Sequence, residues 1–263
     1  MKLIGSKKRR AFTIIELLVI LIVVAVIAAT LLPSLANTKI QSQAFHCQSN
    51  LKRLTTAWMQ YSVDNEDNLM ISTTWVGGGS GSYMTWGNDP RTTNIAPLLT
   101  NYIGAYVQAP ALYKCPADRY QTADNPGPRV RSVSMNDHLG RGGYDNTYVT
   151  RKLSDLNKPG PAMIYVLLDE QADSIDDGNF AFDKNQVGAS ERWLNLPGSY
   201  HNSAGSLSFA DGHTEIHKWQ NNNRNNPTLY EVQFISPAYL PPWDLVSGKS
   251  MDYEWMNARM PYR

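Results

Sequence analysis

Residues 7–18 read KKRRAFTIIELL, and the fold follows from this stretch and the apolar run that continues it to Leu32. Of the 21 residues from Phe12 to Leu32, only three interrupt the hydrocarbon. They are Thr13, Glu16 and Thr30. A helix rises about 1.5 Å per residue, so this run is about 30 Å long, the thickness of a bilayer core. The sequence therefore predicts a membrane-spanning helix whose one carboxylate, Glu16, needs a reason to be there, because a charge in lipid is costly.

This segment resembles the class III leader of type IV pilins and type II secretion pseudopilins. In that family a prepilin peptidase cuts the chain before the Phe, and the new N-terminus is usually N-methylated. The resemblance implies a leader of residues 1–11, a cut between Ala11 and Phe12, and Glu16 as the fifth residue of the mature chain. The family usually has Gly before the cut, where this chain has Ala11. A secretory signal peptide or a simple membrane anchor is the alternative, but neither explains Glu16.

Glu16 is interpreted as an assembly device and not as a catalytic acid. After cleavage, Phe12 would carry a free amine, which in a bundle of such helices can lie beside the Glu16 carboxylate of a neighbouring subunit. Pairing two charges offsets the desolvation of each, whereas an unpaired buried charge costs several kcal/mol. The expected partners are therefore the prepilin peptidase, other pilin or pseudopilin subunits in a homo- or hetero-oligomeric filament, a secretion platform protein and the lipid bilayer.

The distribution of charge predicts the topology. The net charge is +1, and the first 11 residues hold five basic side chains and no acidic one, so the mature chain has a net charge of −4. A mildly acidic chain argues against nucleic acid as a partner. Basic residues before an apolar helix place its N-terminus in the cytoplasm. We therefore expect a single-pass protein of a bacterial inner membrane whose C-terminal domain is periplasmic or extracellular.

The helix is expected to continue beyond the membrane. Apolar side chains recur at helical spacing after residue 33, which is the pattern of an amphipathic helix with one buried face. They are Ile40, Ala44, Cys47, Leu51, Leu54, Trp58 and Tyr61. The sequence thus predicts one helix over residues 12–63, divided into a transmembrane part (12–33) and an amphipathic part (34–64). Pro33 is expected to bend it, since proline removes a helical hydrogen bond. Residues 65–263 would form an extracytoplasmic α+β domain.

The two cysteines, Cys47 and Cys115, suit an oxidising compartment, in which a disulfide between them could tie the helix to the domain. Two unpaired, buried thiols are the alternative. Neither cysteine has a second Cys or a His at metal-ligand spacing, so no metal site is expected from them.

Residues 64–68 end the helix in a cluster of oxygen-bearing side chains. Calcium prefers such ligands, so calcium is possible there. The spacing is not that of an EF-hand loop, and a solvated helix end is the alternative.

Two segments give the strand signals. Residues 164–168 form a continuous apolar run followed by acidic residues, which predicts a central strand. Residues 206–210 and 213–217 alternate on either side of Asp211-Gly212, which predicts a hairpin with a two-residue type I′ turn. That turn would pair Ala210 with His213 and Leu207 with Ile216.

The hairpin also carries a second resemblance. His201, nine residues and then Asp211-Gly212 match the signature of the prepilin-type H-X9-DG domain, here residues 201–212, for which no biochemical activity can be carried over. A metal-binding or catalytic role is the alternative for this region, because His201 and Asp211 with other polar neighbours could form a metal site or an acid–base set. The neighbours considered are His213, His217, Asp169 and Glu170. An Asp at a turn more often bonds its own backbone, so His201, Asp211 and Gly212 are expected to be structural.

The expected fold is α+β, a pilin-like lollipop in which the long N-terminal helix packs on an antiparallel sheet with loop-rich insertions. The expected function is structural: a subunit processed by prepilin peptidase and assembled into a type II secretion pseudopilus or a type IV pilus-like filament. No nucleophile stands in a recognisable motif, so no catalytic residue is predicted and the protein is not expected to be an enzyme. A surface adhesin that binds glycans through its aromatic tail (residues 228–263) is the first alternative, and a membrane-anchored extracytoplasmic enzyme is the second.

Overall fold

The computed structural model describes residues 13–76, 92–119, 129–140, 149–172, 174–175, 177–184, 193–220 and 251–262, with the backbone alone at residues 33–36. The chain divides into two units, Met1–Gln41 and Ser42–Arg263, and each is described by itself. The predicted leader and the cut between Ala11 and Phe12 lie outside the described residues.

The long helix expected from the sequence is present as α1, Ile14–Asp64. In the first unit, its large apolar side chains from Ile14 to Leu32 are between 46% and 83% exposed. With a mean hydropathy of 3.1 in its most apolar window, α1 is long and apolar enough to cross a membrane. The bend predicted at Pro33 falls among the residues whose side chains are not described.

The second unit contains a five-stranded sheet in the order β3-β1-β2-β4-β5. The strands are β1 (Val133–Asn136), β2 (Tyr165–Asp169), β3 (Asn179–Phe180), β4 (Ala204–Phe209) and β5 (Thr214–Lys218). Neighbouring strands are antiparallel except β1 and β3, which are parallel. The α+β class is confirmed, and the sheet is mixed where an entirely antiparallel one was expected.

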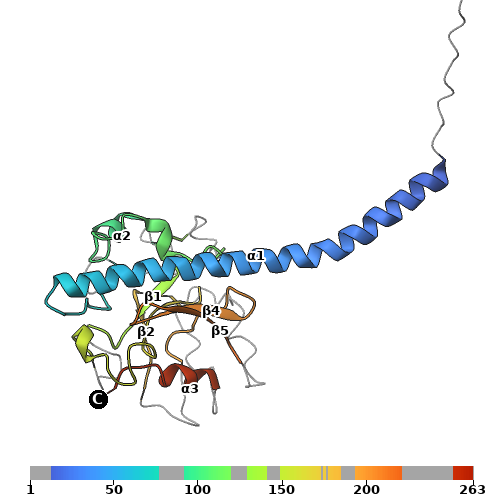
Figure 1. The fold of residues 1–263 in the computed structure, drawn as a ribbon. Coiled ribbons are helices and arrows are strands. Elements are labelled where there is room, and N and C mark those ends of the chain that lie inside the picture. Colours follow the sequence, from blue (N-terminus) through green and yellow to red (C-terminus); the bar gives the residue numbers. More distant parts are fainter. Residues whose placement is uncertain are drawn as a thin grey trace, which may run out of the picture. The chain divides into compact units, whose positions relative to one another are not determined.

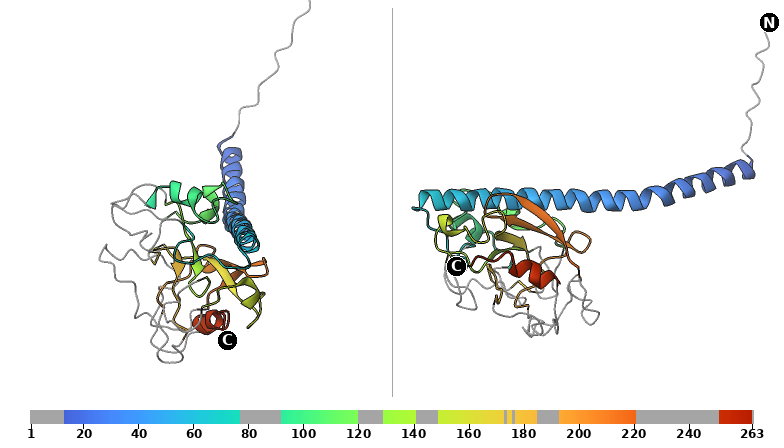
Figure 2. Two further views of the ribbon diagram at one scale, coloured as in Figure 1. Left: turned by 90° about the vertical axis from the view of Figure 1, so that its left-hand side faces the viewer. Right: turned by 60° about the horizontal axis from the view of Figure 1, so that its bottom comes forward.

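The sheet is covered on both faces (Figure 1). The part of α1 from Ser42 to Asp64 lies along one face, and α3 (Met251–Asn257) lies against the other, as both views of Figure 2 show. The short helix α2 (Ala96–Thr100) and the 3-10 turn Pro110–Tyr113 belong to the loop-rich segment beside α1. Every residue of β2 and β4 is therefore buried.

The face under α1 combines an apolar core with small polar groups. The fully buried side chains of Leu51, Leu54 and Trp58 belong to the same apolar cluster as Met135 and Leu167 of the sheet. Ser206 and Ser208 of β4 are also fully buried there. The Thr55 hydroxyl of α1 donates a hydrogen bond of 2.6 Å to Ser208 Oγ, so the helix is joined to the sheet by polar as well as apolar contacts.

The opposite face holds a second core, which is mainly aromatic. Leu207 and Phe209 of β4 pack there with Tyr165 of β2 and with Tyr253 and Met256 of α3. Within the described part of the predicted aromatic tail, the chain thus packs against the sheet. Residues 221–250 of that tail lie outside the described residues.

The predicted hairpin exists, but its predicted turn is wrong. β4 and β5 pair Ser208 with Thr214 and Leu207 with Glu215, one residue out of the expected register. A type I′ turn needs positive φ at both central residues. Here Gly212 has a φ of +90°, and the positive-φ residues do not include Asp211. Hydrogen bonds from Gly212 N–H to Phe209 O and from Phe209 N–H to His213 O define a three-residue loop with a glycine bulge.

Candidate functional site

The start of α1 is a capping box. The Glu16 carboxylate accepts hydrogen bonds from the backbone N–H of Thr13 (2.8 Å) and from its hydroxyl (2.9 Å), while the Thr13 hydroxyl accepts one from the backbone N–H of Glu16 (3.2 Å). This reciprocal pattern is the Thr-x-x-Glu signature of a helix N-terminus, and the sequence analysis did not use it. Glu16 therefore has a hydrogen-bond partner within its own chain.

The apolar helix surface from Ile14 to Leu32 has no covering partner within the described residues. A continuous apolar surface of this kind needs either lipid or other apolar helices around it. In the first unit, this surface and the capping box are the two features available for membrane insertion and for assembly.

A second site lies in the other unit, between α1 and the sheet. Four side chains of metal-ligand type, Cys47, Cys115, Asp169 and His201, are all buried, and their ligand atoms lie within 4.8 Å of one another. Each comes from a different segment: the buried face of α1, the loop after the 3-10 turn, the end of β2 and the residues before β4. We call these four residues the Cys-Cys-Asp-His cluster.

Contacts within the cluster link all four members. The Cys47 thiol donates to both carboxylate oxygens of Asp169, at 3.1 and 2.9 Å. Cys115 Sγ is 3.4 Å from His201 Nε2, and that nitrogen is 3.6 Å from Asp169 Oδ2. Both cysteines are free thiols, so the disulfide predicted between Cys47 and Cys115 is not formed in this structure, although the two residues do meet.

Neighbouring groups hold the cluster in place. The backbone N–H of Ser206 donates to Asp169 Oδ2 at 3.3 Å, and Ser132 Oγ accepts from the backbone N–H of Cys115 at 2.7 Å. A Cβ added to Gly198 would lie 2.9 Å from the Asp169 Cβ, so the chain can pass over Asp169 only as glycine. The Asp169 carboxylate is thus held by a backbone N–H of β4, and the backbone of Cys115 is held by the hydroxyl of the residue before β1.

The chemistry of the cluster is that of a buried, mutually bonded set. Burial raises the pKa of the Cys47 thiol well above its usual value, and the neighbouring Cys115 and Asp169 act in the same direction. Burial alone would lower the pKa of His201, but hydrogen bonds to Asp169 and Cys115 outweigh it and raise that pKa to about 9.

The two halves of the H-X9-DG motif lie at opposite ends of β4. The strand has six residues, so its ends are about 17 Å apart at 3.4 Å per residue. His201 belongs to the Cys-Cys-Asp-His cluster, whereas the Asp211 carboxylate accepts a hydrogen bond from the backbone N–H of His213 at the turn. The motif residues consequently do not form one site.

The other candidate residues have separate structural contacts. His213 Nδ1 lies 2.6 Å from Asp211 Oδ1, and the His217 ring stacks on Trp255 of α3. Glu170 accepts hydrogen bonds from the hydroxyls of Ser134 and Ser174. Of the predicted alternative, a metal or acid–base set, only His201 and Asp169 come together, in the Cys-Cys-Asp-His cluster. The other four members, which are Glu170, Asp211, His213 and His217, do not join them.

The acidic helix end, where calcium was considered, is bonded to its own chain. Asp64 accepts hydrogen bonds from Gln60 and Tyr106, and Asp67 accepts them from the backbone and hydroxyl of Ser154. These contacts give the carboxylates partners without a cation.

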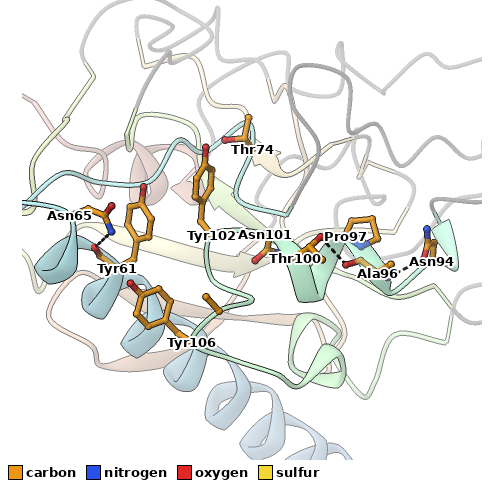
Figure 3. Close-up of a pocket in the computed structure, with 11 residues that line it drawn as sticks. Tyr61, Asn65, Thr74, Asn94, Ala96, Pro97, Thr100, Asn101, Tyr102 and Tyr106 are labelled. Carbon is orange, nitrogen blue, oxygen red and sulfur yellow. Dashed lines mark hydrogen bonds between the residues drawn. The ribbon is translucent and has the colours of Figure 1, made fainter.

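An open groove of about 720 Å³ lies between the end of α1 and the α2 segment (Figure 3). Tyr61, Tyr102 and Tyr106 line it together with amide side chains. Those amides belong to Asn65, Asn94 and Asn101. The rings of Tyr61 and Tyr102 meet edge to face, and Tyr102 is 43% exposed. The groove thus combines aromatic surface with hydrogen-bonding groups.

Comparison with known proteins bears on the first unit. A family model described as the prokaryotic N-terminal methylation motif matches residues 6–32. Neither the comparison with curated proteins nor that with solved structures gave a match. The family match ends at Leu32, so the likeness to the H-X9-DG domain rests on the motif residues alone. The first unit of this chain therefore carries a prepilin-type N-terminal methylation motif, which supports a precursor of the type IV pilin or pseudopilin kind.

Proposed function

We propose that this chain is a pilin-like subunit of a bacterial inner membrane that prepilin peptidase cuts between Ala11 and Phe12. The mature subunits then assemble, through their apolar helices, into a type II secretion pseudopilus or a type IV pilus-like filament. Before assembly the N-terminus is cytoplasmic, the first part of α1 spans the membrane, and the second unit lies outside it.

The observation that supports this most directly is the coincidence of the methylation motif with the exposed apolar helix. The motif covers residues 6–32, and the described part of the same segment is helical with its apolar side chains exposed. One surface can then face lipid in the monomer and neighbouring helices in the filament. A simple anchor needs the lipid-facing surface but not Glu16 within it.

The capping box indicates how the Glu16 carboxylate could have a partner both in the membrane-bound monomer and in the filament. In the monomer, Glu16 has Thr13 as its partner, which reduces the cost of carrying a carboxylate at this position. In a filament, the free amine of a neighbour's Phe12 would replace or join that partner and form a charge-assisted hydrogen bond, which is about twice as strong as a neutral one.

We propose a structural rather than an enzymatic role. A catalytic metal or acid–base site keeps one position open to its substrate. All four members of the Cys-Cys-Asp-His cluster are buried where α1 meets the sheet, which favours a role in holding the fold together.

Mass spectrometry of the membrane-extracted protein tests the processing step. In cells with an active prepilin peptidase, we expect a chain that begins at an N-methylated Phe12. In cells without the peptidase, it should begin in the basic leader. An unprocessed chain in both strains, or cleavage beyond Leu32 in either, would refute the proposal.

Substitution of Glu16 tests the assembly step. Glu16→Gln keeps an N-terminal capping partner for Thr13, since either Glu or Gln serves in a capping box, but it removes the charge. We expect Glu16→Gln to insert into the membrane normally and to lose most of the filaments recovered by shearing, whereas the control Glu16→Asp keeps the charge and retains more of them. Wild-type filament yield from Glu16→Gln would rule out charge pairing.

The aromatic groove favours a second candidate function, a surface subunit that binds glycans. The exposed ring of Tyr102 and the partly buried rings of Tyr61 and Tyr106, beside amide groups, suit stacking and hydrogen bonding to a sugar. A glycan array with the purified chain tests this. Binding that is abolished by Tyr102→Ala and retained with the exposed Phe45→Ala control would support it, and no binding to any glycan would dismiss it.

A further inference from the structure

We propose that the Cys-Cys-Asp-His cluster binds one zinc ion, which fastens helix α1 to the sheet of the second unit. The inference does not depend on filament assembly. It rests on the way in which four distant segments deliver one ligand-type side chain each to the same buried point.

Two of the distances between ligand atoms match those of tetrahedral coordination. With bonds of about 2.3 Å to sulfur and 2.0–2.1 Å to nitrogen or oxygen, neighbouring ligand atoms of a tetrahedron are about 3.4–3.8 Å apart. The distance from Cys115 Sγ to His201 Nε2 is 3.4 Å, and the distance from that nitrogen to Asp169 Oδ2 is 3.6 Å. The contact of Cys47 Sγ with Asp169 Oδ2, at 2.9 Å, is shorter by less than 1 Å, so these two side chains would have to move apart when the ion binds.

The orientation of the imidazole supports the same interpretation. Nε2 of His201 faces Cys115 and Asp169, which are both cluster members, and Nδ1 is buried without a hydrogen-bond partner among the described residues. The polar contacts of this ring are therefore made by the other ligands alone. A histidine that served only to stabilise a loop would be expected to bond to that loop.

The donor set selects the metal. Two thiolates and an imidazole are the ligands that zinc prefers, and calcium or magnesium would require mainly oxygen ligands. Four protein ligands complete a tetrahedral shell, and the site is closed to solvent, as structural zinc sites are. On binding, the two thiols and the protonated imidazole would release their protons to solvent, so that two thiolates, one carboxylate and a neutral imidazole surround the dication.

The neighbouring groups have the form of an outer shell. The Ser206 N–H holds the Asp169 carboxylate at 3.3 Å, and metal-bound carboxylates are usually held by such hydrogen bonds. Because Cys47 lies on α1 and the other three ligands lie on the sheet side, the ion would act as a cross-link between them. A disulfide between Cys47 and Cys115 would make the same connection but would leave Asp169 and His201 without a role in it.

The test uses the full chain, purified in detergent and dialysed against zinc under reducing conditions. We expect one zinc per chain by elemental analysis, and two titratable thiols after denaturation with a chelator. With cobalt in place of zinc, thiolate-to-cobalt charge-transfer absorption should appear in the near ultraviolet. If the concentration of free zinc is about 1,000 times the dissociation constant, removal of the zinc should lower the midpoint of thermal unfolding by about 8–16 °C.

Variants separate zinc from the alternatives. Asp169→Asn keeps the shape of the carboxylate, and His201→Gln keeps a polar side chain of similar length without the imidazole. Both should lower zinc affinity at least 100-fold, whereas His46→Ala, an exposed neighbour of Cys47 on α1, should bind as the wild type does. In a parallel sample purified without reductant, thiols that titrate only after reduction, with no zinc bound, would show a disulfide and overturn the proposal. Free thiols without stoichiometric zinc would overturn it equally. If a variant fails to fold, the cobalt spectrum of the wild type still tests the proposal, because a lack of thiolate-to-cobalt absorption would overturn it.

Discussion

The hydrogen bond from Thr55 to Ser208 offers a sharp test of how α1 is seated on the sheet. Both hydroxyls are fully buried, and the oxygens are 2.6 Å apart. Thr55→Val removes the donor and leaves a Ser208 lone pair buried and unsatisfied. Such a loss costs about 1–3 kcal/mol. Ser208 Oγ also lies 3.4 Å from the Leu167 carbonyl, to which it donates, so the cost should be near the lower end, about 1–2 kcal/mol.

The double variant Thr55→Val/Ser208→Ala should cost less than the sum of the single variants, because it removes both partners and leaves no orphan. We expect a coupling energy of about 0.5–1.5 kcal/mol. In a unit of this size, 1 kcal/mol lowers the thermal midpoint by about 2–4 °C, so Thr55→Val should lower it by about 2–8 °C.

Thermal unfolding of the detergent-solubilised chain, followed by tryptophan fluorescence, measures both quantities. Thr56→Val is the matched control, since Thr56 is the next residue on α1 but is exposed, and within the described part of the chain its hydroxyl bonds only to Lys52 O of its own helix. It should change the free energy of unfolding by no more than about 0.5 kcal/mol. Two results would refute this packing of α1 on the sheet. One is that the free-energy changes of the two single variants add up to that of the double variant, and the other is that Thr55→Val destabilises the chain no more than Thr56→Val does.

Two further predictions concern the turn and the core. Gly212→Ala should destabilise the chain by about 1–2 kcal/mol because Gly212 has a φ of +90°. Among the described residues the added Cβ meets only Met59 Sδ, at 3.6 Å, so the cost comes from the backbone conformation and not from a clash. An unchanged midpoint of urea unfolding would contradict the turn assignment. Burial raises the pKa of Tyr113 to about 12, from about 10 in the unfolded chain, despite a hydrogen bond with Asn101 that lowers it. The folded state therefore holds this proton more tightly, and its stability should fall as the pH rises from 10 to 12. Tyr113→Phe should flatten that fall, and an identical alkaline unfolding curve would contradict it.

The sequence predicted the parts of the fold that depend on regular spacing. The stripe on α1 repeats every three or four residues, and its members Cys47, Leu51, Leu54 and Trp58 are at most 1% exposed. The central strand was readable because residues 164–168 are apolar without interruption. The two-residue strand β3 has no such pattern and was not predicted, since its pairing with β1 depends on the surrounding tertiary structure.

The hairpin shows where local signals stop being sufficient. Asp211-Gly212 favours a turn, but a type I′ turn and a three-residue loop with a glycine bulge use similar residues. The choice between them shifts the register by one residue, which moves side chains to the other face. Because β4 is buried on both faces, alternation of Ser and apolar residues there could not reveal which face was the core.

The Cys-Cys-Asp-His cluster was not predicted as one site because its members are far apart in the sequence. The sequence analysis paired Cys47 with Cys115 and placed His201 with Asp169 in a possible metal site, but it did not join the two pairs. Intervals of 68, 54 and 32 residues separate Cys47, Cys115, Asp169 and His201, whereas recognisable metal motifs place at least two ligands a few residues apart. Each residue carried a partial signal, such as Cys47 on the buried stripe and His201 ahead of a strand. The Thr13–Glu16 capping box, in contrast, was readable from its spacing and was overlooked.

The way in which α1 lies along the sheet has a mechanical consequence. The stretch Ser42–Asp64 has 23 residues and a length of about 35 Å, and its contacts with the sheet are distributed along it from Cys47 to Trp58. Tension applied parallel to the helix axis loads all of these contacts together in shear, so none can yield alone. Tension applied across the axis would peel them apart one after another. The second unit is thus built to resist pulling in the direction of its own long helix.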